Sequence, residues 1–289
     1  MVEKQSLVKD LAHVAVLLIL LVVLLVIVTK FKVIHPSVIP GWQGVYCTYI
    51  EQKHSVVGFV YGADGAGDPE ALVTLLSNTR PTMRSELVQL EDITPGLLSR
   101  YEVLVLEKDK TVSFRALSAL SSYLDSGGTV IWVGDSLSHQ VLDSRDLEEA
   151  RQLNATKLDW VNRTGKDYYS WFLEKYQNQI GFGEFGNQFF GGYLRTEKAS
   201  GASTLNPVIR DHLLLSGIPR VKFARGTSLS VVNQNDGVNM LANIEHNGQT
   251  FPGILEIKYV GRILYFAFPL EALDSQTFLD NIFDYLVTC

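Results

Sequence analysis

The chain has 289 residues, with 25 basic and 31 acidic side chains, a net charge of −6 and two cysteines. A weakly acidic chain lacks the clustered Lys and Arg that bind phosphates, so nucleic acid is not expected as a partner. Two cysteines cannot make a disulfide-stapled miniprotein or a four-thiolate zinc site, and 46% hydrophobic residues make the chain too apolar to be disordered.

The first predicted elements are a short tail, residues 1–10, and an apolar stretch, residues 11–29, that is long enough to cross a bilayer. Every residue from 14 to 28 is Val, Leu, Ile or Ala, and about 20 helical residues span the hydrocarbon core. A signal peptide would have a shorter apolar core and then a small-x-small cleavage site, whereas Lys30 and Lys32 follow here. We therefore expect an uncleaved, single-pass transmembrane helix that anchors the chain in the lipid bilayer of the cell membrane.

Residues 30–55 read as a stalk, because Pro36 and Pro40 prevent the helix from continuing. The lysines before and after the apolar stretch are equal in number, so the charge rule for membrane orientation does not decide the topology.

Two other features favour a C-terminal domain outside the cytoplasm. Asn154 and Asn162 each begin a glycosylation sequon. Cys47 follows the anchor closely and Cys289 ends the chain; they are either a disulfide, which would persist only in an oxidising compartment, or two unrelated thiols.

From residue 56 onward, short apolar runs alternate with helical patterns. We expect strands at residues 56–61, 87–90, 101–106 and 129–133, one helix that begins at Asp68-Pro69 and another over residues 113–124. This alternation predicts a parallel sheet with right-handed crossovers, and near-continuous apolar strands indicate that helices cover both faces. Residues 56–289 are therefore predicted to form one three-layer α/β domain.

An insertion at residues 143–195 interrupts this pattern, first polar and helical and then rich in Gly and aromatic residues. Regular structure resumes with short strands and a last helix near residues 275–286. We interpret residues 228–259 as antiparallel strands that extend the sheet, with Asn247-Gly248 as a hairpin turn.

Three segments carry a resemblance to a known family: YEVLVLEKDKTVSFRALSALSSYLDSGGTVIWVGD at 101–135, DHLLLSGI at 211–218 and GRILYFAFPLEAL at 261–273. They resemble the class I glutamine amidotransferase-like superfamily, and the first is similar to non-catalytic branches such as the GIFT domain, found in an oligosaccharyltransferase subunit and in intraflagellar transport proteins. The resemblance covers about residues 56–286 and implies a flavodoxin-like sheet.

The catalytic members of that superfamily place a cysteine on a tight strand-to-helix turn, in a pattern like GICLGHQ, and a His-x-Glu pair after a late strand. Here residues 134–140 read GDSLSHQ, so Ser136 stands at the cysteine position and Ser138 replaces the second glycine. After the late strand only Glu271 matches, because the histidine is replaced by Pro269. We therefore expect no amidotransferase activity and no enzyme; Ser136 with Glu271 is the fallback for a serine hydrolase.

No metal or cofactor is predicted. The six histidines form no HxH or HxxxH pair. The Gly-rich segment at residues 62–67 lacks the lysine and the spacing of a phosphate-binding loop.

Residues 168–193 contain ten of the chain's 30 aromatic residues. Exposed aromatic patches mark contacts with proteins or membranes, whereas the same residues could also be ordinary core. The candidates for an interaction surface are those of the Gly-rich part, Phe182, Phe185, Phe189, Phe190 and Tyr193.

Three functions follow from these patterns. The first is a non-catalytic interaction module, an accessory subunit of a membrane protein complex, and the resemblance makes oligosaccharyltransferase and its catalytic subunit the leading candidate partner. The second is a membrane-anchored serine hydrolase using Ser136. The third is a receptor for a small polar ligand or glycan, bound above the carboxyl ends of the parallel strands.

Overall fold

The structure is a computed structural model of the chain. It describes residues 2–30, 34, 39, 41–51, 55–80, 83–157, 159–177, 179–273 and 275–287, without the side chains of residues 2–12, 43, 44, 47, 48, 51 and 184. The chain forms two units, one built on its first 54 residues and the other from Ser55 to Val287.

The first unit consists mainly of the helix α1 (Val2–Lys30). Its segment His13–Lys30 has a mean hydropathy of 2.8 and is almost wholly exposed, so it is long and apolar enough to cross a membrane. Part of the predicted stalk is helical: α2 (Trp42–Val45) runs into a π-helical turn, η2 (Tyr46–Glu51).

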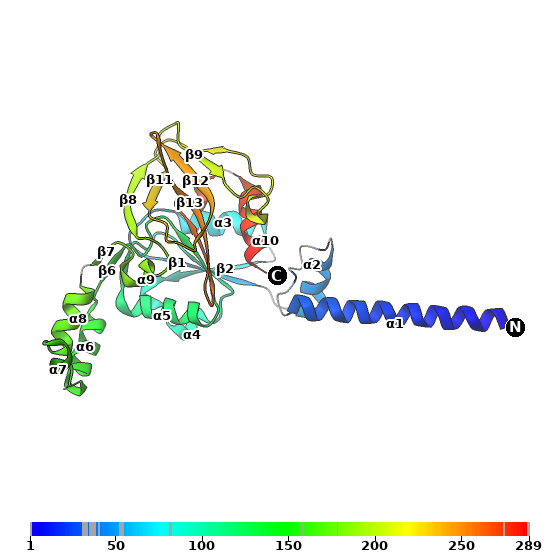
Figure 1. Cartoon of the computed structure of the whole chain (residues 1–289), viewed down its shortest axis with the longest axis horizontal. Coiled ribbons are helices and arrows are strands. Elements are labelled where there is room, and N and C mark those ends of the chain that lie inside the picture. The colour runs from blue at the N-terminus through cyan, green and yellow to red at the C-terminus, as the bar shows by residue number, and fades with distance from the viewer. Residues whose placement is uncertain are drawn as a thin grey trace. The chain divides into compact units, whose positions relative to one another are not determined.

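The second unit is built on a nine-stranded sheet (Figure 1). Five strands are parallel: β1 (Val56–Tyr61), β2 (Arg84–Gln89), β3 (Val103–Leu106), β5 (Thr129–Val133) and β14 (Arg262–Phe266). They lie in the order β2-β1-β3-β5-β14. Every residue of β3 is buried, which is why it reads as an unbroken apolar run.

Helices cover both faces of this sheet, as the sequence predicted. Figure 1 shows α3 (Pro69–Thr79) and α10 (Gln276–Leu286) on one side, and α4 (Pro95–Leu98) and α5 (Phe114–Asp125) on the other. Side-chain caps start them: Asp68 accepts from the Ala71 amide, and Ser113 accepts from the Ala116 amide. Short 3₁₀ turns complete the connections, at η3 (Leu90–Asp92), η4 (Leu213–Leu215) and η5 (Leu270–Ala272).

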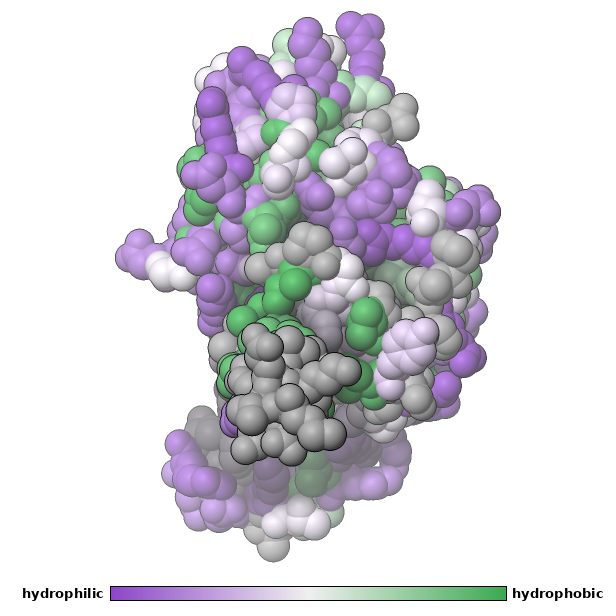
Figure 2. All heavy atoms as spheres, turned by 90° about the vertical axis from the view of Figure 1, so that its right-hand side faces the viewer, coloured by the Kyte–Doolittle hydropathy of each residue, from purple (hydrophilic) through white to green (hydrophobic). Residues whose placement is uncertain are grey.

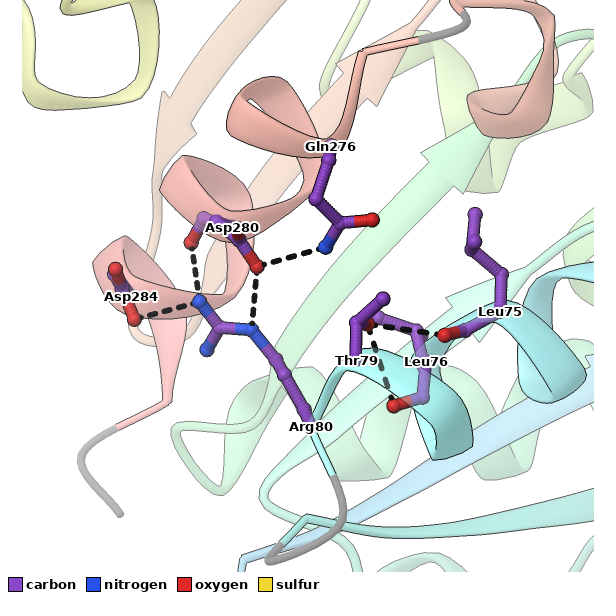
Figure 3. A network of polar contacts seen from close by, with 7 residues as sticks. All are labelled: Leu75, Leu76, Thr79, Arg80, Gln276, Asp280 and Asp284. Carbon is purple, nitrogen blue, oxygen red and sulfur yellow. Dashed lines mark hydrogen bonds and ion pairs between the residues drawn. The ribbon is translucent and has the colours of Figure 1, made fainter.

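A polar network joins α3 to α10 (Figure 3). The guanidinium of Arg80, the C-cap of α3, donates from Nε to Asp280 Oδ1 at 3.0 Å and from Nη2 to Asp284 Oδ1 at 2.8 Å. A further bond from Nη2 reaches the carbonyl oxygen of Asp280 at 3.0 Å. This fork of donors fixes the first helix of the domain against the last.

The antiparallel half of the sheet consists of β9 (Thr204–Pro207), β10 (Val221–Lys222), β12 (Asn239–His246) and β13 (Gln249–Lys258). Asn247 and Gly248 have φ values of 49° and 76°, as the predicted hairpin turn between β12 and β13 requires. The strand β11 (Ser228–Val232) corrects one expectation, since it pairs with β8 (Tyr193–Lys198) in a separate ribbon and does not extend the main sheet.

The inserted segment supplies one strand of a small sheet, β7 (Gln179–Ile180), and a helical lobe. The sheet contains β7 together with β4 (Thr111–Ser113) and β6 (His139–Val141). We call residues 144–177 the lobe; its helices are α6 (Ser144–Thr156), α7 (Trp160–Thr164) and α8 (Tyr168–Tyr176), which project from the sheet in Figure 1. A last short helix, α9 (Gly183–Asn187), follows. The α/β domain carries mainly hydrophilic side chains in the upper part of Figure 2.

The fold confirms the predicted class: a three-layer α/β domain with a parallel sheet extended by antiparallel strands, after one apolar N-terminal helix.

Candidate functional site

The position where this fold would hold a ligand is the carboxyl edge between β1 and β3. The chain leaves β1 for β2 on one side and returns to β3 on the other, so the strand order reverses at this point. Open α/β sheets bind ligands in the crevice that such a reversal creates. The loops that follow β1, β3 and β5 meet here.

The chain's own loop, residues 62–67, fills this crevice. The Ala66 amide donates to Asp135 Oδ1 at 3.0 Å, and the Ala66 carbonyl accepts from the Lys108 amide at 3.0 Å. Asp64 takes two bonds from Thr111, from the amide at 2.9 Å and from the hydroxyl at 2.7 Å. Gly67 has a φ of 110°, and a Cβ there would lie 2.3 Å from Glu107 Cγ. The glycines predicted to make a simple turn therefore allow the loop to close tightly over the strand ends.

Beneath this loop lie carboxyl groups that are cut off from solvent. Glu107 and Asp109 are both 0% exposed, and neither carboxyl makes a hydrogen bond of ordinary geometry among the described residues. Burial raises the pKa of Glu107 well above its usual range, and the adjacent Glu271 carboxylate raises it further. Burial also raises the pKa of Asp109 to about 7, an effect that the hydroxyl of Ser136 partly offsets. Glu107 is therefore held in its protonated form well above the pH at which an exposed carboxyl ionises.

Backbone strain gathers at the same edge. Lys108 and Leu137 have φ values of 59° and 58°, a region that side chains other than glycine rarely adopt. Lys108 separates the two buried acids, and the Leu137 amide donates to the Asp109 carbonyl at 2.9 Å. Such strain persists only where surrounding contacts fix it.

The structure places Ser136 at this edge but closes it off. Its side chain is 0% exposed, and its hydroxyl donates to the Leu106 carbonyl at 3.1 Å. The chain after β5 turns into the short strand β6 and not into a helix, so Ser136 does not sit on a strand-to-helix elbow. Glu271 lies near Glu107. Among the described residues it makes no hydrogen bond to a histidine, so it does not orient a catalytic base for Ser136.

A second serine lies in an arrangement that the sequence did not suggest. Ser203 Oγ is 2.7 Å from His246 Nδ1, and His246 Nε2 is 3.1 Å from Glu197 Oε2. The order of contacts is that of a serine–histidine–carboxylate triad. However, Ser203 is 0% exposed, and its Oγ also accepts from the Ser200 amide at 2.9 Å. This network fastens the loop before β9 to the end of β12.

Sequence reasoning missed this network because 43 residues separate Ser203 from His246 and no motif joins them. The one available signal was a histidine at the end of a predicted strand, immediately before a hairpin turn. Among the described residues no group of three or more His, Cys, Asp or Glu could hold a metal ion.

The structure contradicts the predicted interaction surface of the Gly-rich segment, because its aromatic rings are buried or partly buried. Phe182, Phe189 and Phe190 are at most 3% exposed, so they are core. Phe182 and Phe190 each lie 5.0 Å, centroid to centroid, from the ring of Trp132. Phe185 and Tyr193 are partly buried against the same core. The reason is that this segment covers the face of β5 and β14 that carries Trp132 and Tyr265, and Gly186 lets it pack closely, since a Cβ there would lie 3.3 Å from the Trp132 ring.

The lobe is where aromatic rings remain partly open to solvent. Among its described residues, Ala150, Tyr168 and Phe172 form the buried hydrophobic centre, and the other rings are half-buried. Cations lie over these rings at 4.5–5.5 Å, from Arg151, Lys157, Arg163 and Lys175. The Trp160 Nε1 proton is buried and finds no acceptor among the described residues.

Both predicted sequons fall in the lobe, in different settings. Asn162 is exposed on α7. Asn154 is half-buried on α6, and its Oδ1 accepts from the Tyr169 amide at 3.2 Å. The side chain of Cys47 and the whole of Cys289 lie outside the described residues, so the disulfide stays a prediction.

Comparisons with known proteins support the fold only. No protein-family model matches the chain, and no curated protein matches its sequence. Among solved structures, a ThuA-like protein from Bacteroides uniformis is 13% identical with a TM-score of 0.53, over 81% of this chain and 93% of its own. A β-galactosidase from Rahnella sp. R3 is 13% identical with a TM-score of 0.51, over 80% of this chain but 31% of its own.

Proposed function

We propose that the protein is a non-catalytic, membrane-anchored interaction module, an accessory subunit of a membrane protein complex. One observation carries the proposal: the crevice where this fold binds ligands is filled by residues 62–67, and the polar groups beneath it are sealed from solvent. A site that substrate cannot enter performs no chemistry, so binding other proteins is the function that best fits a domain held at a membrane.

The apolar helix α1 supports anchoring in the cell membrane by a single pass. An extracytoplasmic α/β domain agrees with the exposed sequon at Asn162. The resemblance to the GIFT domain makes oligosaccharyltransferase, and so protein N-glycosylation, the leading candidate complex.

The lobe is the surface proposed to bind the partner. Trp, Tyr and Arg dominate binding energy at protein interfaces, and the lobe holds all three types half-exposed.

The test compares two charged variants during affinity purification from membranes. Val161 on the lobe is 48% exposed and Val260, in the turn between β13 and β14, is 69% exposed, so neither Val161→Asp nor Val260→Asp disturbs the core. We expect Val161→Asp to lose the co-purifying membrane proteins and Val260→Asp to keep them. Equal recovery of partners by both variants would remove the lobe as the docking surface.

A second function is favoured by one groove. A hollow of about 750 Å³ lies over β9 and β12, in the size range of small-ligand sites. Asn206 Nδ2 donates to Asn243 Oδ1 at 3.3 Å, which leaves an amide donor and an acceptor for a polar ligand. Arg210 and the ion pair of Arg220 with Glu245 line the same hollow. A glycan would bind here and not at the closed carboxyl edge; a flat thermal-shift screen against sugars would dismiss this function.

A further inference from the structure

The short helical segment after α1 folds back onto the end of that helix. Trp42 Nε1 donates to Thr29 Oγ1 at 3.0 Å, and both side chains are buried, with 8% and 1% of their surface exposed. Tyr46, one helical turn later, is 1% exposed, and its ring centroid lies 6.1 Å from that of Trp42. Trp42 and Tyr46 therefore form the inner face of residues 41–51, which packs on the last turns of α1.

Three apolar side chains that the structure describes in the same segment are exposed. Val45 and Tyr49 are four residues apart, and 46% and 74% of their surfaces are exposed. Ile50 beside them is 38% exposed. Exposed apolar side chains grouped on one short segment mark a contact surface, so we consider another apolar phase as their partner.

The position of Trp42 along α1 indicates that this apolar phase is the lipid bilayer. The apolar segment His13–Lys30 has 18 residues and so is about 27 Å long, close to the hydrocarbon thickness of about 30 Å. Thr29 is therefore at one boundary of the hydrocarbon, and the Trp42 ring bonded to it lies at the same level. Tyr residues concentrate at this boundary, where the ring meets acyl chains and the hydroxyl meets water, and Tyr49 on the same segment is 74% exposed.

Figure 1 shows α2 lying across the end of α1. A segment that crosses a membrane-spanning helix at the hydrocarbon boundary lies in the plane of the bilayer surface. We propose that residues 41–51 form an interfacial helix that binds the lipid headgroup layer through Val45, Tyr49 and Ile50, with Trp42 fixing its depth. This inference rests on the membrane anchoring in the proposed function. The exposed side chains of residues 41–51 continue the exposed apolar surface of α1.

The experiment uses the full chain in phosphatidylcholine vesicles, either plain or brominated near the headgroup end of the acyl chains. Flotation first shows whether the chain is membrane-anchored. Bromine quenches only tryptophans that touch it, and Trp42 is buried against α1, so the reporter is a tryptophan placed on the exposed side of the segment by Tyr49→Trp. We expect Tyr49→Trp to add emission that bromine quenches, and the matched control Tyr259→Trp, at a residue of the α/β domain that is 46% exposed, to add emission that bromine does not quench.

Two results would overturn the inference alone, while anchoring stands: a floated chain in which the emission added by Tyr49→Trp is not quenched, or one in which the emission added by Tyr259→Trp is quenched equally. The second would mean that contact with lipid is not particular to residues 41–51. A chain that does not float would overturn the anchoring and the interfacial helix together.

Discussion

Replacing the buried acid Asp109 by its amide should stabilise the protein at alkaline pH. Its carboxyl is 0% exposed and makes no hydrogen bond of ordinary geometry among the described residues. Its ionised form therefore lacks both water and a counter-charge, whereas the side-chain amide introduced by Asp109→Asn has nearly the same shape and never ionises.

The magnitude follows from the raised pKa. Asp109 titrates near 3.8 when unfolded and its pKa rises to about 7 when folded. Between these values the folded state holds a proton that the unfolded state has lost, so the free energy of unfolding falls as pH rises, by about 1.4 kcal/mol per unit. The loss is complete above pH 7 and amounts to about 4 kcal/mol. The variant does not lose this energy, so its advantage over the parent should grow by up to that amount from about pH 4 to about pH 8.

The assay is chemical unfolding of the detergent-solubilised chain at both pH values. Trp132 is a suitable reporter, because its Nε1 donates to the Ser136 carbonyl at 2.8 Å beside this cluster. The matched control is Asp64→Asn in the overlying loop, where both carboxylate oxygens are already bonded to Thr111; it should lose about 1 kcal/mol at the higher pH. The reasoning is refuted if the difference between Asp109→Asn and the parent is the same at both pH values, or narrows as pH rises.

Three further outcomes are expected. Phe190→Ala should lower the free energy of unfolding by about 3–5 kcal/mol, because it leaves a cavity where a fully buried ring was. An unchanged melting temperature would mean that Phe190 is not part of the core. Arg80→Ala should cost about 1 kcal/mol, and less at high salt, since its two carboxylate partners are more than a third exposed. Arg84→Ala should cost nearly nothing, because the Arg84 side chain is 67% exposed. The parent should show no labelling by a fluorophosphonate, and labelling that Ser136→Ala abolishes would establish the hydrolase instead.

Local patterns were enough to predict most of the elements. The strands at residues 56–61 and 129–133 match their predicted bounds, because buried parallel strands need unbroken β-branched runs. The turn at Asn247-Gly248 also matches, because its positive φ values restrict the residue types.

The pairing of strands that are far apart in the chain could not be predicted from local sequence patterns. The apolar pattern of residues 228–232 fits a strand equally well in the main sheet or in the ribbon with β8, and only the chain path decides between them. The aromatic segment failed for a related reason. Phe182 and Phe190 lie among glycines, which is typical of a surface loop, but the face of Trp132 that they cover becomes visible only in the folded sheet.

The sequence predicted where the candidate site lies, but not that the site is closed. The alignment of Ser136 and Glu271 with a catalytic pattern pointed to the carboxyl edge, and the structure brings both residues there. Neither the buried acids nor the strain at Lys108 and Leu137 has a sequence signature, because each arises from how the 62–67 loop closes.

The most direct test of the central claim is the mass of the native assembly after gentle detergent extraction of the membrane, followed by affinity purification on this chain and mass spectrometry. We predict an assembly well above the 32.2 kDa of the chain, with other membrane proteins in fixed stoichiometry. A lone chain, recovered with no stoichiometric partner, would contradict an accessory subunit.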